Sequence, residues 1–561
     1  MRQQSFPSNL KNFIVQTSFD VEDIKRDYPN LLITSIAPQI IDVEILPGGE
    51  EDFQRFQRQF KLLFVPIALG LNANGALADA NISVFHNYPY GELRGRDIII
   101  GFIDTGIDYT NVLFKEANNT TRIVGIWDQT IEGNPPPGFI YGTEYLKEQI
   151  DEALSAADPY TIVPSRDEIG HGTFLAGVAA GDDKTGEATY RGGAPEAFIA
   201  MVKLRPARED IKAYYLIREE AIAYQENDLI AGITYLQELA RRLTKPLVIC
   251  IGVGANFGAH NGNNITEQYL ETLSSAQAIL LVVAVGNEAN SDHHYSGRVE
   301  NNESETLEIN VAENEKGFSL FLWTAVSNKL TLSIKSPIGQ VIEKVPLLPG
   351  EIQTYRFNLE QTILSVIYVY PDAQTGGERI LLFFEAPTPG LWSITVYGEN
   401  VLDGVYNIWL PRNGFIEADT RFLKPDPEIT VQIPATSISP IVVGGYDYID
   451  QSIYIASGRG PTTANVIKPD LVAPSVNVQG PQLTGGYTTY VGTSVAAAIT
   501  ASACALLLQW ALYEGNLQTI NTRVARAILI RGARRTDGIV YPNSVEGYGK
   551  LDLQNSIANV Y

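Results

Sequence analysis

The sequence of 561 residues is poor in several residue types, and each shortage excludes a class of protein. It contains two cysteines, Cys250 and Cys504, which excludes a disulfide-stapled scaffold. Both lie in apolar runs, so we expect packed thiols rather than reactive ones. Basic residues are scarce too: 41 Lys and Arg against 64 Asp and Glu give a formal net charge of −23. That balance argues against nucleic acid and anionic membranes as partners.

The sequence also lacks clear targeting segments. Its N-terminus has no charged region followed by an apolar run, so no signal peptide is expected. Residues 494–513 run without a charge for about the length that a bilayer needs. They are rich in Ala, Ser and Thr and follow a Gly-Thr turn, which favours a buried helix of a soluble domain over a membrane span. We therefore expect no transmembrane segment.

The first 74 residues predict a small α+β module. Apolar strand-like segments at 12–17, 31–46 and 62–68 alternate with helical patterns that begin at Asp20 and Glu50. The following stretch, 70–80, consists of small residues without periodicity. It predicts a linker or a cleavable segment.

Two later regions, 75–297 and 426–561, predict one α/β domain. Short apolar runs that end in Gly or Asp alternate there with helical stretches, which is typical of a parallel sheet flanked by helices. Between them, residues 298–425 alternate strands with turn signals and lack helical periodicity. They predict an inserted antiparallel β-sandwich, jelly-roll-like in kind.

Two residues of the α/β region are candidate proton-handling groups. His171 lies between glycines at the start of an apolar helix, and an imidazole accepts a proton near neutral pH. Its plain alternative is a surface loop histidine. Asp104 ends an apolar strand, where parallel α/β sheets place their active sites, although a turn or capping aspartate is also common there.

A hydroxyl and an amide complete the set of candidates. Ser494 opens the uncharged helix, where it is either a helix cap or a nucleophile facing backbone N–H groups. Asn287 follows a buried strand, where it is either a turn residue or the amide donor of an oxyanion hole. The order Asp, His, Ser along the chain is one of three unrelated arrangements of the serine-protease triad.

The motifs around these residues resemble those of the subtilase family. DTGID at 104–108, HGTFLAG at 171–177, VGNE at 285–288 and GTSVAAA at 492–498 occur in subtilase order. KPDLVAPSVNV at 468–478 and SGRGP at 457–461 are similar to neighbouring subtilase stretches. The resemblance covers about residues 80–300 and 425–561.

A closer resemblance is to the Csp proteases of clostridial spores. WDQTIEGNPPPGFIYGTEY at 127–145, GANFGAHNG at 254–262 and the sandwich inserted before the serine are similar to that subgroup. Two departures from the wider family are Phe174, where a second histidine is usual, and Val495-Ala-Ala, where Met-Ala-Ser-Pro is usual. Neither replaces a reacting group.

The resemblance implies an α/β, subtilisin-like serine endopeptidase. In it Asp104, His171 and Ser494 would be catalytic, Asn287 would form the oxyanion hole, and Gly252, Val253 and Gly254 would pair with a protein or peptide substrate. It also implies a prodomain that the enzyme cleaves from itself within 71–80 and keeps bound. Resemblance to the Csp proteases further implies a cytoplasmic or spore-associated bacterial enzyme that activates a zymogen in germination. No Asp/Asn run has the spacing of a calcium loop, so we expect neither a metal nor a cofactor.

Two alternatives remain open at this point. The chain could be a catalytically silent subtilase-like binding or signalling protein, since the Csp subgroup includes members without triad residues. The sandwich could bind carbohydrate through its aromatic residues instead of bracing the protease domain, although alternating aromatics in strands usually form core. The aromatic residues in question are Phe321, Trp323, Tyr368, Tyr370 and Trp392.

Overall fold

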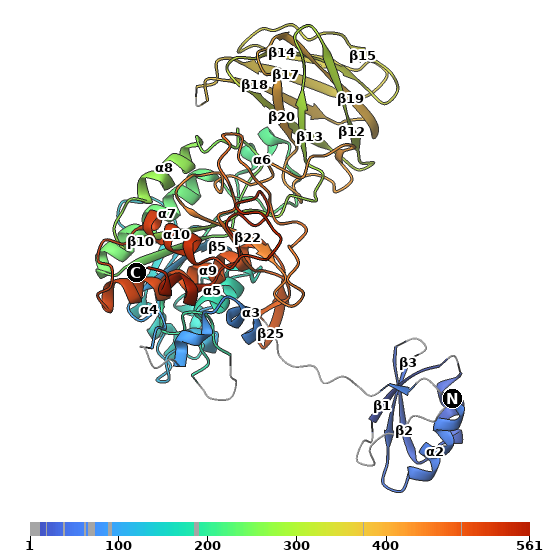
Figure 1. Cartoon of the computed structure of the whole chain (residues 1–561), viewed down its shortest axis with the longest axis vertical. Helices are drawn as coiled ribbons and strands as arrows, with labels where there is room; N and C mark the ends of the chain where they lie inside the picture. Colours follow the sequence, from blue (N-terminus) through green and yellow to red (C-terminus); the bar gives the residue numbers. More distant parts are fainter. Residues whose placement is uncertain are drawn as a thin grey trace. The chain divides into compact units, whose positions relative to one another are not determined.

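A computed structural model describes most of the chain. The described residues are 12–17, 19–37, 40–60, 63–64, 73–87, 92–184, 190–373, 375–483 and 485–560. The chain divides into two compact units, Met1–Leu71 and Asn72–Tyr561 (Figure 1).

The first unit is an α+β module with an antiparallel sheet in the order β2-β3-β1-β4. Its apolar core joins the aromatic side of α2, with Phe53 and Phe56, to the inward residues of the strands. The order differs from the predicted strand-helix-strand-helix-strand in one respect: the strand-rich segment 31–46 contains two strands. Of the last expected strand, 62–68, the structure describes Leu63 and Phe64. The elements are β1 (Asn12–Gln16), α1 (Val21–Asp27), β2 (Leu31–Ala37), β3 (Ile40–Ile45), α2 (Glu50–Gln59) and β4 (Leu63–Phe64).

The expected linker is partly helical, which corrects the sequence prediction. Residues 70–72 lie outside the described part of the chain, but α3 (Ala73–Asp79) forms a helix of the second unit. Its Ala76 and Leu77 are buried in the core of that unit. Small side chains permit this close approach: a Cβ on Gly75 would lie 2.7 Å from the ring of Tyr448. The sequence lacks hydrophobic periodicity here because small residues form a short packed helix, and not because the segment is a free linker.

The second unit is built on a sheet whose described strands follow the order β23-β22-β10-β9-β5-β8-β6-β7. Neighbouring strands are parallel except for the pair β6 and β7 at one edge. Each parallel strand is an almost continuous apolar run because both faces of the sheet are covered. The strands are β5 (Ile99–Asp104), β6 (Ile123–Asp128), β7 (Thr143–Leu146), β8 (Phe198–Lys203), β9 (Leu247–Ile251), β10 (Ile279–Ala284), β22 (Ile441–Tyr446) and β23 (Leu471–Pro474).

Helices cover both faces of this sheet. One apolar cluster packs α5 and α9 against one face, and a second cluster packs α7 and α8 against the other. All sixteen residues of α9 are buried. Within the described residues, Thr493–Tyr513 is the one helical stretch that is long and apolar enough to cross a bilayer. Of its apolar 18-residue segment, 89% is buried in the protein core. The α-helices are α4 (Lys147–Ser155), α5 (His171–Ala180), α6 (Glu209–Tyr215), α7 (Glu226–Leu243), α8 (Ile265–Leu273), α9 (Thr493–Leu508), α10 (Thr522–Gly532) and α11 (Leu553–Ala558). There are also short 3₁₀ helices η1 (Ser83–Asn87), η2 (Val112–Phe114) and η3 (Pro159–Thr161), and a π-helix η4 (Gln509–Tyr513).

The insert forms two antiparallel sheets that share one core, in the orders β11-β20-β13-β18-β17-β16 and β15-β14-β19-β12-β21 (Figure 1). It starts earlier than residue 298, because β11 (His294–Arg298) already pairs with β20. A hairpin of β24 (Val478–Pro481) and β25 (Tyr487–Tyr490) in the second α/β region forms a separate two-stranded sheet. The other insert strands are β12 (Ser304–Val311), β13 (Gly317–Thr324), β14 (Lys329–Lys335), β15 (Val341–Ile342), β16 (Ile352–Arg356), β17 (Ile363–Val369), β18 (Glu378–Glu385), β19 (Gly390–Asn400), β20 (Val405–Trp409) and β21 (Arg421–Phe422).

The aromatic residues of the insert are used for packing. Tyr368 and Trp392 belong to its core. Phe321 and Trp323 lie in a cluster with residues of the α/β domain. Tyr370 is 42% exposed, whereas the other four aromatic residues are buried. This distribution supports a brace for the α/β domain rather than a carbohydrate-binding platform.

Candidate active site

Asp104 is the last residue of β5 and lies at the carboxyl edge of the sheet. It is 1% exposed, and its Oδ1 accepts a hydrogen bond from the backbone N–H of Thr105 at 2.8 Å. The same Oδ1 lies 2.7 Å from Nδ1 of His171. A buried carboxylate therefore fixes one ring nitrogen of the histidine as an N–H donor.

His171 is the first residue of α5, and its backbone is set by the glycines beside it. Gly170 has φ +90°, a conformation that favours glycine, and a Cβ on Gly172 would lie 2.2 Å from the carbonyl oxygen of Gly106. Since Nδ1 donates to Asp104, the lone pair of the neutral ring is on Nε2. That atom lies 2.9 Å from Oγ of Ser494, whose hydroxyl donates to it.

The pKa of His171 reflects two opposing effects. Burial of the ring lowers the pKa, but the negative charge of Asp104 and its hydrogen bond raise it, and the net pKa is above the ordinary value. The charge of Asp167 adds to the rise, whereas the positive charge of Arg412 lowers the pKa. The imidazolium form is thus stabilised, as a base needs when it takes up a proton.

Ser494 lies in the first turn of α9 and is 7% exposed. Gly492, just before the helix, has φ +154°, and a Cβ there would lie 3.6 Å from the Ser494 hydroxyl oxygen. The turn therefore leaves open space in front of this oxygen at the positive end of the helix dipole, where developing negative charge is stabilised.

Asn287 points its amide nitrogen toward the same space. Its Oδ1 accepts hydrogen bonds from the backbone N–H and the hydroxyl of Thr493, at 3.0 and 3.1 Å. These bonds fix the orientation of the side-chain amide. A Cβ on Gly492 would lie 3.7 Å from Nδ2 of Asn287 and 3.6 Å from Oγ of Ser494. The amide N–H₂ and the Ser494 hydroxyl therefore flank the same space.

The glycines after β9 form one wall of the site. A Cβ on Gly252 would lie 3.3 Å from Cβ of Ser494 and 3.4 Å from Oδ2 of Asp104. Gly252, Val253 and Gly254 line a cavity of about 1010 Å³ together with His171 and Ser494. All seven residues that the sequence predicts for the site are thus brought together.

Asp167 is a residue that the sequence analysis missed. Its Oδ1 accepts from the Thr105 hydroxyl at 2.8 Å and from the N–H of Gly170 at 2.8 Å, and its Oδ2 accepts from the N–H and hydroxyl of Thr173. The carboxylate therefore caps α5 and ties the loop before His171 to the residue after Asp104. An aspartate a few residues before an apolar helix is a capping signal that could have identified it.

Arg412 was also missed, and no local pattern marks it. It belongs to the segment between β20 and β21 of the insert, and its Nη1 donates to the carbonyl oxygen of Gly254 at 3.1 Å. Only the folding of the insert onto the α/β domain brings this cation to the cavity.

Phe174 packs where the wider family resemblance leads one to expect a second histidine. Its ring stacks on Tyr490 of β25 with centroids 4.2 Å apart, and it is completely buried. The phenyl ring therefore packs against the hairpin of β24 and β25, and it has no group that could make the hydrogen bonds of a histidine. Cys250 and Cys504 are buried, and burial raises the pKa of both thiols, as expected for packed cysteines.

Comparison with known proteins identifies the family and a similar structure. The family model described as the subtilase family matches residues 95–336 and 423–549, more than half of the chain. The structure is similar to that of the CspB protease of Clostridium perfringens, with a TM-score of 0.76 and 33% identity over 86% of this chain and 96% of that one.

Curated relatives match over less of their length. The membrane-bound transcription factor site-1 protease of Homo sapiens is 36% identical over 131 residues, which are 22% of this chain and 12% of that protein. The subtilisin-like protease SBT3.5 of Arabidopsis thaliana is 21% identical over 478 residues, 78% of this chain and 57% of that protein. The chain thus spans a small part of the first relative and somewhat more than half of the second.

Proposed function

This chain belongs to the subtilase family and is a subtilisin-like serine peptidase; from that premise we propose that Asp104, His171 and Ser494 are its catalytic triad. The observation that carries the proposal is the unbroken hydrogen-bonded chain from Asp104 to His171 to Ser494, at 2.7 and 2.9 Å. A catalytically silent binding protein has no need of this arrangement.

The roles follow from the chemistry of the three groups. Ser494 attacks the carbonyl carbon of the peptide bond while Nε2 of His171 takes its proton, and the imidazolium then gives that proton to the leaving amine. Asp104 holds the ring so that Nε2 faces the serine, and it stabilises the charged ring. Water then attacks the acyl-enzyme with the same histidine as base.

Asn287 is proposed to stabilise the tetrahedral oxyanion together with the backbone N–H of Ser494. The support is its fixed amide orientation beside the Ser494 hydroxyl. Loss of one such donor costs about 10²–10³ in kcat. The Gly252–Val253–Gly254 edge is proposed to pair with an extended substrate, because glycine backbone permits close approach of a second chain.

The first unit is proposed to be a prodomain that the enzyme removes from itself and keeps bound. An extended substrate is needed for cleavage, whereas α3 is helical and packed through Ala76 and Leu77. We therefore place the cleavage at or ahead of the start of α3. Resemblance to the Csp proteases supports a further role: limited cleavage of a cortex-lytic hydrolase zymogen by a cytoplasmic or spore-associated enzyme during germination.

The deciding experiment is intact mass measurement and N-terminal sequencing of purified wild type and Ser494→Ala. We expect a new N-terminus near the start of α3 in wild type only, with both fragments eluting together in gel filtration. Ser502→Ala is the matched control, because the hydroxyl of this buried serine of the same helix donates to the Ile499 carbonyl and does not line the cavity. It should self-cleave like wild type.

The opposite outcome is equally clear. If wild type and Ser494→Ala both run as one 561-residue chain, the triad is unproductive and the silent binding protein replaces the peptidase as the working function. Cleavage of a spore hydrolase zymogen by wild type, absent with Ser494→Ala, would test the physiological role.

A further inference from the structure

The insert forms part of the wall of the active-site cavity. The cavity that contains His171 and Ser494 is also lined by Trp323 of β13, by Arg379 of β18 and by Arg412 from the segment after β20. We call Trp323, Arg379 and Arg412 the insert wall. A module that served only as a brace would have no need to reach the cavity of the nucleophile.

Aromatic packing holds this wall firmly on the α/β domain. The ring of Tyr215, at the end of α6, stacks on Phe257 with centroids 4.4 Å apart, and Phe257 lies 5.5 Å from Phe321 of β13. The hydroxyl of Ser319 donates to the carbonyl of Tyr215 at 3.0 Å. These contacts orient the insert wall relative to Ser494, as a substrate-binding surface requires.

Each residue of the insert wall carries a buried N–H group without an acceptor. Among the described residues, Nε1 of Trp323, Nε of Arg379 and Nε of Arg412 have no hydrogen-bond partner. Trp323 is 6% exposed, and the Arg379 guanidinium lies 5.1 Å above its ring. Buried donors are normally satisfied, so three in one cavity wall indicate a place for acceptor oxygens of a ligand.

Arg412 also differs from the other cavity arginines in charge balance. Arg218 pairs with Glu220 and Glu417, and Arg379 pairs with Asp372 at 3.3 Å. Within the described residues, Arg412 has no carboxylate at ion-pair distance, and its Nη1 donates to the Gly254 carbonyl. The guanidinium has five N–H donors in all, so most of its capacity remains for a ligand.

The carboxylates near this cation make hydrogen bonds or ion pairs with other groups. Glu220 is held by Arg218, and Glu226 accepts a hydrogen bond from the hydroxyl of Thr266 at 2.7 Å. Glu288 does not line the cavity; it feels the charge of Arg412, but it lies 3.5 Å from Nδ1 of His293 and accepts hydrogen bonds from Asn256 and from the N–H of Asn413. A substrate carboxylate is the complementary partner.

We propose that the insert wall binds an acidic segment of the protein substrate next to the scissile bond, with Arg412 as a specificity-determining residue that takes an Asp or Glu side chain. The proposal rests on the proposed peptidase function. Gly254 is two residues from Gly252, which abuts Ser494. Since an extended chain advances about 3.3 Å per residue, the acidic side chain should lie within about four residues of the scissile bond.

The test is competition between paired peptides in one reaction with the self-cleaved full chain. Each pair differs by Glu or Gln at one of the four positions on either side of the cleaved bond. The ratio of product rates gives the ratio of kcat/KM and does not depend on the fraction of active protein. We expect wild type to favour Glu about tenfold at one position or more, which corresponds to about 1.4 kcal/mol.

Three variants separate recognition from folding. Arg412→Gln should reduce the Glu preference to less than about twofold, and Arg412→Glu should favour a Lys peptide over the Glu peptide. Trp323→Phe keeps an aromatic ring but removes the unpaired N–H, so it should slow long peptides more than peptides that end near the scissile bond. Arg356→Gln is the matched control, because Arg356 is an exposed insert residue that does not line the cavity. It should keep the wild-type ratio.

Equal rates for Glu and Gln peptides at all positions would overturn the proposal, and so would an unchanged preference in Arg412→Gln. Labelling of Ser494 by a fluorophosphonate distinguishes failure of the inference from failure of the proposed function. If the serine is labelled but Glu is not favoured, only the inference fails. If the serine is not labelled, the peptidase function fails, and binding of fluorescent Glu and Gln peptides to wild type and Arg412→Gln decides the inference; equal binding overturns it.

Discussion

The pKa of His171 is set at the scale of single residues, by groups that come from distant parts of the sequence. Burial lowers it, Asp104 raises it, and Arg412 lowers it from the other side of the cavity. A histidine base must be neutral before it can accept a proton from Ser494. Activity should therefore appear as the pH rises through the pKa of this ring.

Replacement of Arg412 should shift the pH at which activity rises. Arg412→Gln removes a positive charge that lowers the pKa of His171, so the pKa increases and the acid limb of kcat/KM moves to higher pH. The measurement is the pH dependence of kcat/KM with a small uncharged peptide, beside Arg356→Gln. A midpoint at or below that of wild type would show that Arg412 does not act on the histidine.

At the scale of elements, α5 is a helix whose position depends on one capping carboxylate. Asp167 accepts from Gly170, Thr173 and the Thr105 hydroxyl, while Thr105 in turn accepts from the N–H of Gly172. Asp167 thus positions His171 without contacting substrate. Helix propensity and hydrophobicity alone would assign this apolar, glycine-containing run to a buried helix. They would not predict how the side chain of its first residue, His171, is oriented.

Loss of this cap should harm catalysis more than stability. Asp167→Ala should lower the free energy of unfolding by about 1–2 kcal/mol. It should lower kcat about 10²-fold, because a misplacement of about 1 Å has that effect, with a smaller change in KM. Asp167→Asn should recover part of kcat.

Asn521→Ala is the control, because Asn521 caps α10 through the N–H of Val524. It should lose stability while kcat stays near that of wild type. If Asp167→Ala behaves like Asn521→Ala, Asp167 has only a structural role.

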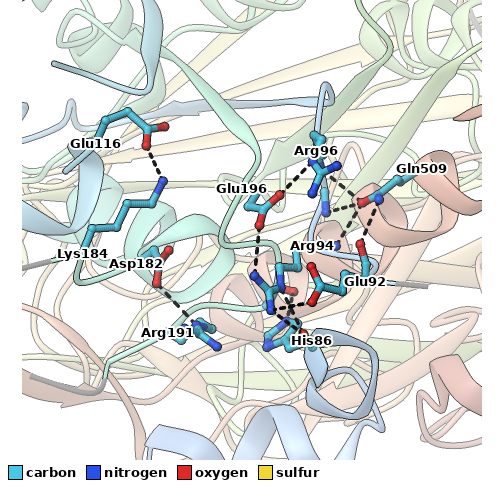
Figure 2. A network of polar contacts seen from close by, with 12 residues as sticks. His86, Glu92, Arg94, Arg96, Glu116, Asp182, Lys184, Arg191, Glu196 and Gln509 are labelled. Atoms are coloured by element: carbon cyan, nitrogen blue, oxygen red, sulfur yellow. Dashed lines mark hydrogen bonds and ion pairs between the residues drawn. The ribbon is translucent and has the colours of Figure 1, made fainter. Parts of the chain in front are cut away.

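At the scale of the whole molecule, the beginning of the second unit is tied to the far end of the nucleophile helix. Figure 2 shows Gln509, just after α9, beside residues 92–96. Its Oε1 accepts from the N–H groups of Arg94, Gly95 and Arg96 at 2.8–3.1 Å, and its Nε2 donates to the carbonyl of Glu92. Arg94 and Arg96 then share Glu196 as an ion-pair partner.

Removal of this amide should weaken the whole unit. Gln509→Ala leaves the buried N–H of Gly95 and the partly buried N–H groups of Arg94 and Arg96 without their acceptor. The free energy of unfolding should fall by about 3 kcal/mol, since a buried orphan donor costs about 1–3 kcal/mol and the two partly buried donors cost less. Gln509→Glu keeps an acceptor oxygen and should lose less. Urea unfolding measures both, with Gln518→Ala as the control because Gln518 is exposed and bonds a single carbonyl. A loss no larger than that of Gln518→Ala would contradict the role of the amide.

The sequence by itself determined the elements and the identity of the candidate site residues. Hydrophobic periodicity and capping signals depend on residues that are neighbours along the chain. For that reason the strands and helices of the α/β domain, the helix that contains Ser494 and the antiparallel insert could be predicted. The order of DTGID, HGT and GTS identified Asp104, His171 and Ser494 before any distance was known. The same local logic misread residues 70–80 as a linker, because small residues at a packed helix carry no periodic signal.

Only the tertiary structure decided what surrounds those residues. The fold brings Arg412 to Gly254, 158 residues away in the sequence, and it places the insert wall in the cavity of Ser494. It also turns Phe321 and Trp323 toward the α/β domain while Tyr368 and Trp392 fill the insert core. Such contacts depend on which surfaces meet when two separately patterned regions pack, and no pattern of neighbouring residues records that choice.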